Sequence, residues 1–596
     1  MEKLLEMKEI CKSFGTNNVL KNVQFDLFAG EVHALIGENG AGKSTLMKIL
    51  MGMYKKDSGS LSVLGSDEAY TNPDQALKAG VAMIHQELNP IPDMSVAENI
   101  FLGKEKRKWI FTSKKEQEKE SKRYLDMLGI DLEPSVLMRE LSVSEMQMVE
   151  IAKALSYGAR IIIMDEPTSA ITEAEVEKLF QNIKMLKEQG TGIIYISHKM
   201  DELFEISDRI TVLRDGQYVF SKKTKDLCPN DLIKAMVGRE ITEIYPESKS
   251  KIGEVRKRDD AGKYYDSCIG IQKGGKRMKV LSKNSVMEFV KKTAILWVMI
   301  ILILILSVIS PSFFRGQNLL NIIKQASITG VIGVGMTFVL ITGGIDLSVG
   351  SVMALSGTMA ASVAVAEKNM PIALVILVGV GLGALCGLIN GIGVSYIGFP
   401  PFIMTLGMMT IARGIPLVFT NGTPIFGLSE EFNMIANSRV LGVPSLVIFL
   451  VITVLAGHII LSKTVLGRRI YAVGGNEDAA RLSGVSTAKV KLFVYVFCGI
   501  LSGIAGILIC SRITSGNGTV AEGYEMNAIS AAVIGGVSMT GGSGNVLGMV
   551  VGAMILTIIQ NSFDIMGVNS FYQNIIKGII ILLAVFLDLR GKKKKN

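Results

Sequence analysis

Residues that bind metals or form disulfide bonds are scarce in this sequence. Its 596 residues include only six cysteines and four histidines, and the cysteines are scattered between Cys11 and Cys510. Their spacing matches neither a metal site nor a disulfide framework. Charged residues make up only 20% of the chain, and the formal net charge is +9.

Most of the surplus positive charge lies in one segment. Residues 249–283 contain eleven Lys or Arg against four Asp or Glu, a local net charge of +7. The surrounding segment, 246–285, has no apolar periodicity, so we expect a basic, flexible linker. It borders the apolar part of the chain, where anionic membrane lipid would attract it. No nucleic acid is needed as a partner to explain this charge.

The chain is too apolar for a soluble protein of this length, with 49% hydrophobic residues and a mean hydropathy of +0.39. Apolar runs follow residue 292, at about 293–310, 328–343, 349–366, 372–396, 402–420, 443–462, 491–511, 526–540, 545–560 and 573–588. About 20 apolar residues can cross a bilayer, and several of these runs are short and Gly-rich enough to be re-entrant or broken helices. We therefore expect an all-α polytopic membrane domain over residues 286–596, with about 8–10 spans.

Basic residues indicate the orientation of this domain. Lys291 and Lys292 precede the first run, six Lys or Arg lie between Lys463 and Lys491, and RGKKKK closes the sequence. The positive-inside rule puts all three segments in the cytosol, which requires an even number of spans. The first residues, MEKLLEMKEI, show no signal peptide. We therefore expect a multi-pass protein of the cell membrane with a cytosolic N-terminal domain.

The run GENGAGKST, residues 37–45, fits the phosphate-loop pattern G-x-x-x-x-G-K-[ST]. Backbone N–H groups of such a loop point at phosphate oxygens, and the following helix offers its positive end. Lys43 can reach the β and γ phosphates, and the Ser44 hydroxyl can ligate Mg²⁺. EVHALIG before the loop predicts a strand, and STLMKILMG after it predicts a helix. ATP and Mg²⁺ are therefore the expected ligands.

Three further strand ends carry polar residues. IIIMDEP, residues 161–167, predicts a buried strand ending in Asp165, placed to hold Mg²⁺ through water, and Glu166, placed to polarise the attacking water. Gln86 follows another short strand, and His198 follows a further one, where a γ-phosphate contact is favoured over an ordinary surface or core histidine. Alternating strands and helices predict an α/β core whose active edge lies at the carboxyl ends of the strands.

Together these motifs resemble the ATP-binding domain of ABC transporters, and over residues 3–245 the first ATPase half of ribose- and galactose-type importers. The resemblance implies an α/β P-loop ATPase domain over residues 1–245, followed by the polytopic membrane domain. It implies that Glu166, His198 and Gln86 are catalytic and that Ser44, Gln86 and Asp165 hold Mg²⁺. The nucleotide-binding residues that it implies, with Phe14 stacked on adenine, are Phe14, Gly37, Asn39, Gly40, Gly42, Lys43, Ser44, Thr45 and Ser142.

The signature loop departs from the usual LSGGQ pattern of this family. The chain has LSVSE from Leu141, so Ser142 is retained while Val143 and Ser144 replace the two glycines. The first ATPase half of galactose-type importers looks similar at this point. Downstream, SAIT (169–172) lacks the Asp that many relatives carry in last place, and MVGRE (236–240) resembles the usual end of the ATPase half.

The apolar half resembles the permease subunits of ribose-type importers, through TGGIDLSVGS (342–351), GLINGIGVSYIGFPPFIMTLGMMTIARG (387–414) and GYEMNAISAAVIGGVSMTGGSG (523–544). Asp478-Ala479-Ala480 and Gly484 resemble the EAA…G coupling helix by which importer permeases dock on their ATPase; a solvated loop helix is the alternative. For Asp346, a helix-breaking structural role is favoured over a sugar contact. Glu525 and Asn527 leave the same choice open.

The domain arrangement also differs from these importers, which usually place two ATPase halves in one polypeptide and the permease in another. Here a single half runs into the permease. Residues 273–278, KGGKRM, are what a ribosome-binding site would encode if it were read in frame before a start codon. Two hypotheses stay open: a deletion joined two neighbouring reading frames, or the segment is an ordinary basic linker.

The sequence therefore predicts ATP-driven import of a monosaccharide by a fused ATPase–permease half-transporter. The resemblance implies an extracytoplasmic sugar-binding protein as a partner. A homodimer, or assembly with other transporter subunits, would complete the transporter, and in a homodimer each ATP would lie between one subunit's phosphate loop and the other's Ser142. Two alternatives stay open: a fusion remnant that binds ATP without transporting, and an ATPase-linked regulator or exporter.

Overall fold

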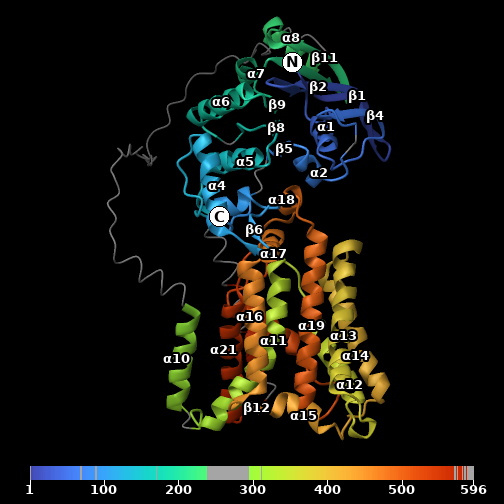
Figure 1. Cartoon of the computed structure of the whole chain (residues 1–596), viewed down its shortest axis with the longest axis vertical. Coiled ribbons are helices and arrows are strands. Elements are labelled where there is room, and N and C mark those ends of the chain that lie inside the picture. The colour runs from blue at the N-terminus through green and yellow to red at the C-terminus, as the bar shows by residue number, and fades with distance from the viewer. Residues whose placement is uncertain are drawn as a thin grey trace, which may run out of the picture.

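The computed structural model describes residues 2–67, 70–86, 90–169, 171–237, 294–309 and 312–569, with isolated positions between 572 and 586. Strands and shorter helices of the N-terminal part occupy one end of the long axis, and long helices of the C-terminal part run along that axis at the other end (Figure 1). The predicted linker 246–285 and the basic tail lie outside the described residues, as do Ala170 of the SAIT segment and residues 238–240 of MVGRE.

A nine-stranded sheet forms the centre of the N-terminal domain, in the order β4-β1-β2-β11-β10-β3-β9-β8-β5. The pairs from β10 to β5 are parallel, whereas β1 pairs antiparallel with both β2 and β4. The strands are β1 (Lys3–Phe14), β2 (Asn17–Phe28), β3 (Val32–Ile36), β4 (Ser58–Val63), β5 (Val81–Ile84), β8 (Ile161–Asp165), β9 (Gly192–Ile196), β10 (Arg209–Arg214) and β11 (Gln217–Lys223).

Helices pack on both faces of this sheet, and the sequence of β3 shows why. All five of its residues are buried, which is typical of a parallel strand covered on both sides. Val32, Ala34 and Ile36 join one apolar cluster, and Leu35 joins the other. The helices are α1 (Lys43–Leu50), α2 (Pro73–Lys78), α3 (Val96–Ile100), α4 (Lys114–Met127), α5 (Val143–Ser156), α6 (Glu173–Glu188), α7 (Met200–Ile206) and α8 (Pro229–Val237). The predicted α/β core is confirmed.

The C-terminal domain is helical, apart from the two-residue strands β12 (Arg439–Val440) and β13 (Val443–Pro444). Its helices are α10 (Ala294–Ile309), α11 (Gly316–Ile341), α12 (Val349–Val363), α13 (Ile372–Ile392), α14 (Pro401–Thr420), α15 (Glu430–Asn437), α16 (Ser445–Lys463), α17 (Val465–Gly475), α18 (Glu477–Leu482), α19 (Thr487–Ile513), α20 (Tyr524–Ile534) and α21 (Val546–Ile565). Within the described residues, six helices are long and apolar enough to cross a membrane: α11, α13, α14, α16, α19 and α21.

Three of the ten apolar runs predicted as spans have a different form, and a fourth is mostly not described. Residues 293–310 and 349–366 correspond to the shorter apolar helices α10 and α12. The run 526–540 overlaps the 11-residue helix α20, whose rise is about 16 Å against a hydrocarbon core of about 30 Å. The run 573–588 lies mostly outside the described residues. The count of about 8–10 spans therefore stays a prediction.

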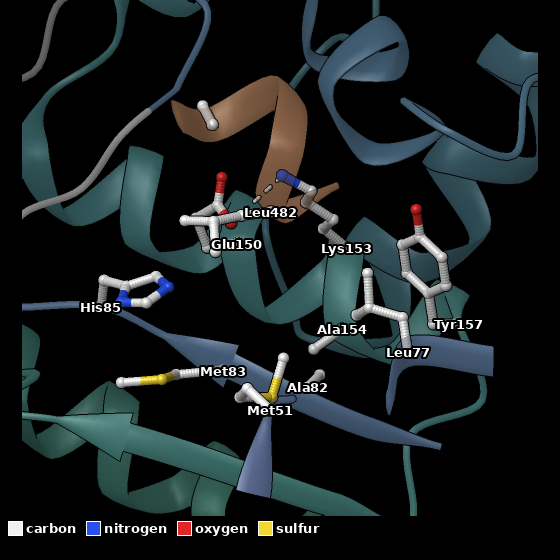
Figure 2. Close-up of a pocket in the computed structure, with 11 residues that line it drawn as sticks. Met51, Leu77, Ala82, Met83, His85, Glu150, Lys153, Ala154, Tyr157 and Leu482 are labelled. Atoms are coloured by element: carbon white, nitrogen blue, oxygen red, sulfur yellow. Dashed lines mark ion pairs between the residues drawn. The ribbon is translucent and has the colours of Figure 1, made fainter. Parts of the chain in front are cut away.

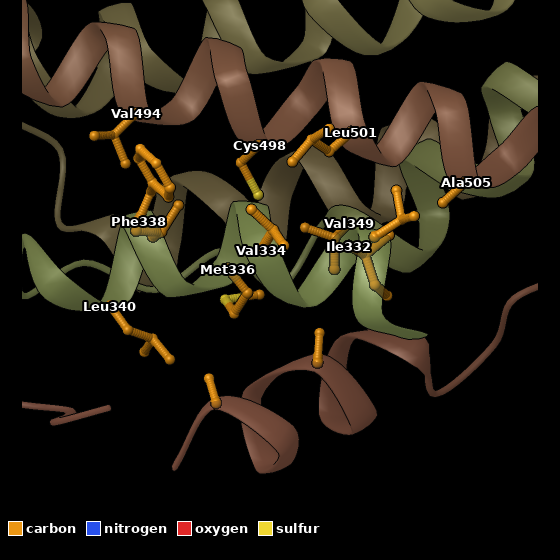
Figure 3. Close-up of a cluster of buried hydrophobic side chains, with 14 of the residues drawn as sticks. Ile332, Val334, Met336, Phe338, Leu340, Val349, Val494, Cys498, Leu501 and Ala505 are labelled. Atoms are coloured by element: carbon orange, nitrogen blue, oxygen red, sulfur yellow. The ribbon is translucent and has the colours of Figure 1, made fainter. Parts of the chain in front are cut away.

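Helix α19 holds the C-terminal domain together by packing against α11, α12 and α13. Figure 3 shows the contact with α11, where Val334 and Phe338 face Val494 and Cys498. All four side chains are buried. Because the facing side chains are apolar and buried, the interface is built from close packing rather than from polar contacts.

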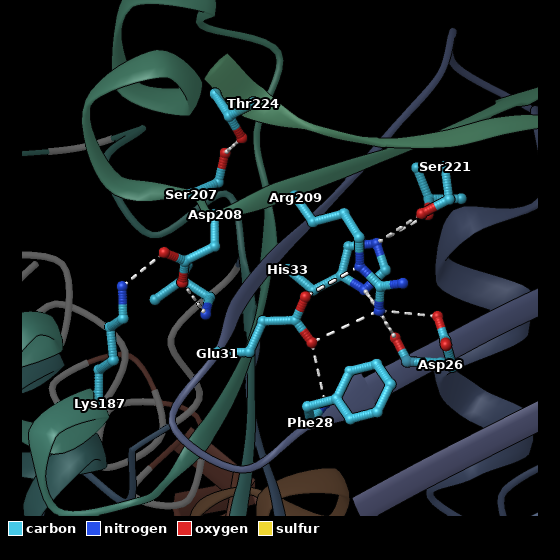
Figure 4. A network of polar contacts seen from close by, with 12 residues as sticks. Asp26, Phe28, Glu31, His33, Lys187, Ser207, Asp208, Arg209, Ser221 and Thr224 are labelled. Carbon is cyan, nitrogen blue, oxygen red and sulfur yellow. Dashed lines mark hydrogen bonds and ion pairs between the residues drawn. The ribbon is translucent and has the colours of Figure 1, made fainter. Parts of the chain in front are cut away.

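A polar network lies where β2, β3 and β10 meet in the N-terminal domain (Figure 4). The Arg209 guanidinium contacts the carboxylates of Asp26 at 2.7 Å and Glu31 at 2.9 Å. His33 lies beneath it, with Nδ1 2.6 Å from the Asp26 carbonyl oxygen and Nε2 2.7 Å from the Thr211 hydroxyl. Burial, together with the nearby Arg209 charge, lowers the pKa of His33 to about 3. The imidazole is therefore neutral in the folded domain.

This burial predicts acid sensitivity. In the unfolded chain, His33 has an ordinary pKa of about 6.5 and takes up a proton below that pH, whereas in the folded domain it stays neutral down to about pH 3. The free energy of unfolding therefore decreases as the pH falls from about 6.5 to about 3. We expect His33 to lower the free energy of unfolding by about 2 kcal/mol between pH 7 and pH 5. Denaturant unfolding of the parent and of His33→Gln at both pH values measures this difference. An equal pH dependence in the two proteins would contradict it.

Candidate functional site

The phosphate loop connects β3 to α1, in the predicted strand–loop–helix context. Gly42 precedes α1 with a φ of 96°, and a Cβ there would lie 2.5 Å from Leu20 Cδ2, so the turn requires glycine. Asn39, Gly40 and Ser44 are exposed beside this turn. The loop thus presents its backbone and the first turn of α1 to solvent, where the orphan N–H groups of a helix are available to an anion.

Lys43 is held over the phosphate loop rather than extended into solvent. Its ammonium donates to the carbonyl oxygens of Gly37 at 2.6 Å and Glu38 at 3.1 Å. Burial lowers the pKa of Lys43, and the carboxylates of Asp165 and Glu166 partly offset that effect. The phosphate loop and the end of β8 are thus close enough for their charges to interact.

The three residues predicted to be catalytic converge in the structure. Gln86 Nε2 donates to Glu166 Oε2 at 2.7 Å, and His198 Nδ1 lies 3.2 Å from Glu166 Oε1. Glu166 has a φ of 46°, in the left-handed region that a non-glycine residue rarely adopts, and its amide donates to the Ile196 carbonyl oxygen at 2.8 Å. Strained backbone of this kind concentrates at functional sites. Side chains that follow β5 and β9 therefore hold the carboxylate that follows β8.

The predicted Mg²⁺ ligands supply oxygen chemistry that suits this ion. Burial raises the pKa of Asp165, Glu166 raises it further, and Lys43 opposes the shift, so a cation beside Asp165 would relieve unfavourable negative charge. Gln86 uses its amide nitrogen on Glu166, which leaves the amide oxygen as the atom that can ligate a cation. Together with the Ser44 hydroxyl, Asp165 and Gln86 offer a few oxygen ligands. This suits Mg²⁺, which usually takes one or two protein ligands and completes its coordination with phosphate and water oxygens. The described residues contain no cluster of three His, Cys, Asp or Glu that could hold a metal alone.

Phe14 lies at the end of β1 with 43% of its surface exposed. Its ring meets that of Tyr54 edge-on, with the ring centroids 5.2 Å apart, and the Lys12 ammonium lies 5.3 Å from its centroid. An exposed, supported aromatic ring is the geometry that stacking on adenine requires. The adenine contact itself stays a prediction.

The signature loop is not part of this constellation within one chain. Ser142 caps α5, and its hydroxyl contacts Glu145 Oε2 at 2.9 Å and Ser144 Oγ at 3.3 Å. The Ser144 hydroxyl also donates to Glu175 of α6. In the described part of the chain, none of the hydrogen bonds made by Ser142 reaches the phosphate loop. The loop instead brings two carboxylates beside its hydroxyls, a feature that the sequence analysis did not detect.

The segment between α16 and α19 is where the two domains meet. The sequence suggested a basic loop there, but the structure has the helices α17 and α18. Arg468 Nη1 lies 2.7 Å from a carboxylate oxygen of Glu98, and Arg469 Nη2 lies 3.0 Å from one of Glu105. Next to these ion pairs, β6 (Arg107–Lys108) and β7 (Phe111–Thr112) form a short hairpin, and the Val465 amide donates to the Ile110 carbonyl oxygen at 3.2 Å.

The EAA-like segment is α18, and it lies against the N-terminal domain, not free in solvent. Ala479 and Ala480 are 4% and 0% exposed. Figure 2 shows Leu482 at a depression lined by Leu77 of α2, His85 after β5, and Tyr157 after α5. The Tyr157 hydroxyl lies 3.3 Å from the Ser483 carbonyl oxygen. The alternative of a solvated loop helix is therefore disfavoured.

The docking depression and the nucleotide site share one short stretch of backbone. His85 and Leu482 line the same depression, while the neighbour of His85, Gln86, contacts Glu166. Helix α5 makes a second connection, because Ser142 caps its N-terminus and Tyr157 follows its C-terminus. Both β5 and α5 contribute buried residues to the same close-packed apolar core.

The contacts of Asp346 inside the membrane domain explain why a carboxyl group is found there. Its Oδ1 accepts from the Ser348 amide at 2.9 Å and from the Ser348 hydroxyl at 2.6 Å, just before α12 begins. Asn390 of α13 donates to the same hydroxyl at 3.0 Å. The side chain is only 2% exposed. These contacts support the helix-breaking role and leave Asp346 with no accessible face for a ligand.

Sequence reasoning missed the acidic half of the domain interface. Arg468 and Arg469 were interpreted only as indicators of orientation, and nothing local to Glu98 or Glu105 distinguishes them from surface carboxylates. Glu105 is nevertheless almost fully buried, with 5% of its side chain exposed. A buried carboxylate needs a partner, and only the docked position of α17 shows which cation that is.

Comparisons with known proteins assign both halves. Residues 20–169 match the family described as ABC transporter, and residues 318–585 match the family described as branched-chain amino acid transport system, permease component. The chain therefore joins an ABC transporter ATPase domain to a permease domain, and it is a membrane protein. Its ATPase domain resembles those of ribose and galactose importers.

Individual relatives match the N-terminal half. The ribose import ATP-binding protein RbsA of Geobacillus kaustophilus is 49% identical over 257 residues, which is 43% of this chain and 52% of that protein. RbsA of Lacticaseibacillus paracasei is 47% identical over 275 residues, covering 45% and 55%. The chain thus spans about half the length of these relatives. A solved ATP-binding cassette of an ABC transporter, in its ADP conformation, is 26% identical with a TM-score of 0.37 and covers 40% of this chain and 100% of its own.

The convergence on Glu166 predicts which step a substitution removes. Glu166→Gln should keep ATP binding but lower kcat by roughly 10²- to 10⁴-fold, because the amide cannot accept a proton from the attacking water. Steady-state hydrolysis and equilibrium nucleotide binding by the purified protein separate the two effects. Glu188→Gln, an exposed position at the end of α6, is the matched control. Parental hydrolysis by Glu166→Gln would show that another group is the base.

Proposed function

We propose that this protein couples ATP hydrolysis to the import of a monosaccharide across the cell membrane. The observation that supports the proposal most is the position of α18, whose Leu482 lines the same small depression as His85, the residue next to Gln86. An ATPase that only bound nucleotide would not require this connection. Nucleotide-dependent movement at Gln86 would be felt first at His85 and α18, and through α17 and α19 by the rest of the membrane domain.

The nucleotide chemistry follows from the geometry around Glu166. Its carboxylate, fixed by Gln86 and His198, orients and polarises the water that attacks the γ-phosphate. Lys43 and the N–H groups at the start of α1 bind the phosphate oxygens and neutralise their charge. Mg²⁺, held by Ser44, Gln86 and Asp165, would supply charge neutralisation on the β and γ phosphates. His198, 65% exposed at the side chain, is free to contact the γ-phosphate.

The substrate assignment rests on two resemblances. The relatives of the ATPase domain are named for ribose import, and the permease motifs resemble ribose-type subunits. The family description of the permease domain names branched-chain amino acid transport instead. We favour a monosaccharide because the ATPase identity is close to one half. Sugar would be delivered by an extracytoplasmic binding protein, and the ATPase domain would lie in the cytosol, beside the basic segments.

A complete transporter needs two ATPase domains and two permease domains, so we propose a C₂ homodimer or an assembly with other transporter subunits. Ser142 supports this arrangement, because it lies outside its own chain's nucleotide site. In a homodimer, Ser142 of one subunit would face the ATP on the phosphate loop of the other.

One observation favours a second candidate, a fusion product that binds ATP without transporting. Val143 is 45% exposed where the usual LSGGQ pattern has glycine, and Glu145 and Glu175 lie beside the hydroxyls of Ser142 and Ser144. Side chains and negative charge at this loop oppose close approach to the γ-phosphate of a partner's ATP. In this candidate the ancestral protein relied on a second ATPase half for its active signature loop.

Reconstitution in liposomes distinguishes the two candidates. The first predicts uptake of labelled D-ribose or D-galactose that requires ATP and binding protein, with hydrolysis stimulated by the loaded binding protein. The second predicts nucleotide binding with neither uptake nor stimulated hydrolysis. Hydrolysis stimulated by sugar without binding protein would favour the regulator or exporter alternative. Uptake of a branched-chain amino acid in place of sugar would overturn the substrate assignment.

The docking of α18 on α2 predicts that transport can be lost while basal ATP hydrolysis is kept. Gly484 follows α18 with a φ of 78°, and a Cβ there would lie 2.8 Å from Asp74 Oδ1 of α2. Gly484→Leu should spare basal hydrolysis but abolish binding-protein stimulation and uptake, because α18 can no longer seat on α2. Gly65→Leu is the matched control, since Gly65 has a φ of 81° but no atom within 4 Å of an added Cβ. Unchanged uptake by Gly484→Leu would remove the coupling role.

A further inference from the structure

The membrane domain contains a polar cavity of about 270 Å³ between α11, the start of α20 and α21. It lies toward the end of the domain that faces away from the ATPase. Ile341, at the far end of α11, lies beside α17, and Gln325 is sixteen residues earlier, about 24 Å along the helix. Helix α21 gives the same placement (Figure 1). The carbonyl oxygen of Gly544, just before this helix, accepts a hydrogen bond from Tyr471 of α17, whereas Gln560 lies near the opposite end of α21.

Three amide side chains line this cavity: Gln325 of α11, Asn527 of α20 and Gln560 of α21. None of the three amide side chains makes a hydrogen bond to another described residue, although each is half-buried. Polar groups at this depth in a membrane domain are costly unless they are paired or wet, and they mark functional sites. Hydroxyls on the same helices differ, since Thr557, for example, donates back to the Ala553 carbonyl oxygen at 2.8 Å.

A neighbouring amide pair shows what a purely structural arrangement of these helices looks like. Asn318 of α11 and Asn561 of α21 donate to each other's side-chain oxygens, at 3.0 and 2.9 Å. That pair satisfies itself across the same two helices. Gln325 lies about two turns after Asn318, and Gln560 is the residue next to Asn561. Both line the cavity instead, so they have hydrogen-bonding capacity left for a ligand.

We propose that this cavity is a subsite for a neutral polyhydroxylated ligand, the monosaccharide, on its path through the membrane domain. This proposal rests on the proposed function and specifies where the substrate is recognised within this chain. Amides donate and accept, as sugar hydroxyls require, and Tyr524 and Phe563 add aromatic surface. The volume lies just below the ~300–1,000 Å³ typical of drug-sized ligands.

The charges of the lining restrict the class of ligand. Asp564, held by a 3.0 Å hydrogen bond from Gln573, and Glu522 line the cavity, and no lysine or arginine is among the described lining residues. A sugar phosphate, or the carboxylate of an amino acid, would meet these negative groups with no cation to pair with. The lining therefore disfavours a sugar phosphate. A branched-chain amino acid could place its ammonium on these carboxylates, but the described lining offers no cation for its own carboxylate, whereas a neutral sugar needs none.

The test compares two double variants in liposomes with binding protein and ATP. Gln325→Leu with Gln560→Leu should lower D-ribose or D-galactose uptake roughly tenfold, as expected for two lost hydrogen bonds, while stimulated ATP hydrolysis persists. Asn318→Leu with Asn561→Leu should instead lower the unfolding midpoint and leave uptake per folded molecule unchanged. Parental uptake by the glutamine variant, or equal loss of uptake and hydrolysis, would overturn the subsite.

A second measurement tests sugar binding in the cavity even if the parent protein transports no sugar and the proposed function fails. In right-side-out vesicles, Gln560→Cys should react with a membrane-impermeant thiol reagent, and excess D-ribose should slow that reaction. L-leucine should not slow it. Absent modification, or modification unaffected by D-ribose, would overturn the subsite independently of transport; protection by D-ribose would support it.

Discussion

The contact on which the rest of the molecule depends is the docking of α17 and α18 on the ATPase domain. It combines two kinds of interaction. Ala479, Ala480 and Leu482 remove apolar surface from water, and Arg468 and Arg469 pair with Glu98 and Glu105. The apolar part supplies attraction without fixing orientation. The ion pairs, one of them with a nearly buried carboxylate, fix the register, because a misplaced α17 would leave that charge unpaired.

Under the proposed function, this docking is the route by which the nucleotide site would move the membrane domain. Gln86 and His85 are consecutive residues at the end of β5, one on Glu166 and the other at α18. Helix α5 makes a second connection, because Ser142 caps its N-terminus and Tyr157 follows its C-terminus. A rigid α/β core between these points means that a change at the γ-phosphate has few ways to be absorbed locally. In the membrane domain, α19 is positioned to spread such a movement, since it packs against α11, α12 and α13.

Polar residues in the membrane domain separate into two groups once their contacts are known. Asp346 and the Asn318–Asn561 pair are satisfied within the protein and hold helices in place. Gln325 and Gln560 make no hydrogen bond within the described part of the chain, and they line a cavity. In the sequence, all of these residues are simply polar positions in apolar runs. A side chain's partner, not its type, determines whether it has capacity left for a ligand.

Much of the ATPase fold could be predicted from the sequence, because its signals are local. The phosphate-loop pattern, about nine residues long, indicates a strand before the loop and a helix after it. The runs that end at Asp165 and His198 are apolar at successive positions, without alternating polar residues, which is typical of parallel strands buried on both faces. The apolar runs likewise predict a helical membrane domain from length alone. Even α18 could be located, since its small residues and Gly484 are adjacent in the sequence.

Only the tertiary structure decided how residues distant in the sequence meet. Gln86, Glu166 and His198 come together because β5, β8 and β9 are neighbours in the sheet, an order that local patterns do not encode. The strained φ of Glu166, the carboxylates beside Ser142, and the partners of Arg468 and Arg469 likewise depend on side chains brought together from remote segments. Hydropathy determined that the C-terminal half enters the membrane, but packing decided that α20 is too short to cross it and that two glutamines face a cavity. Composition is a property of the chain, whereas burial and pairing are properties of the folded molecule.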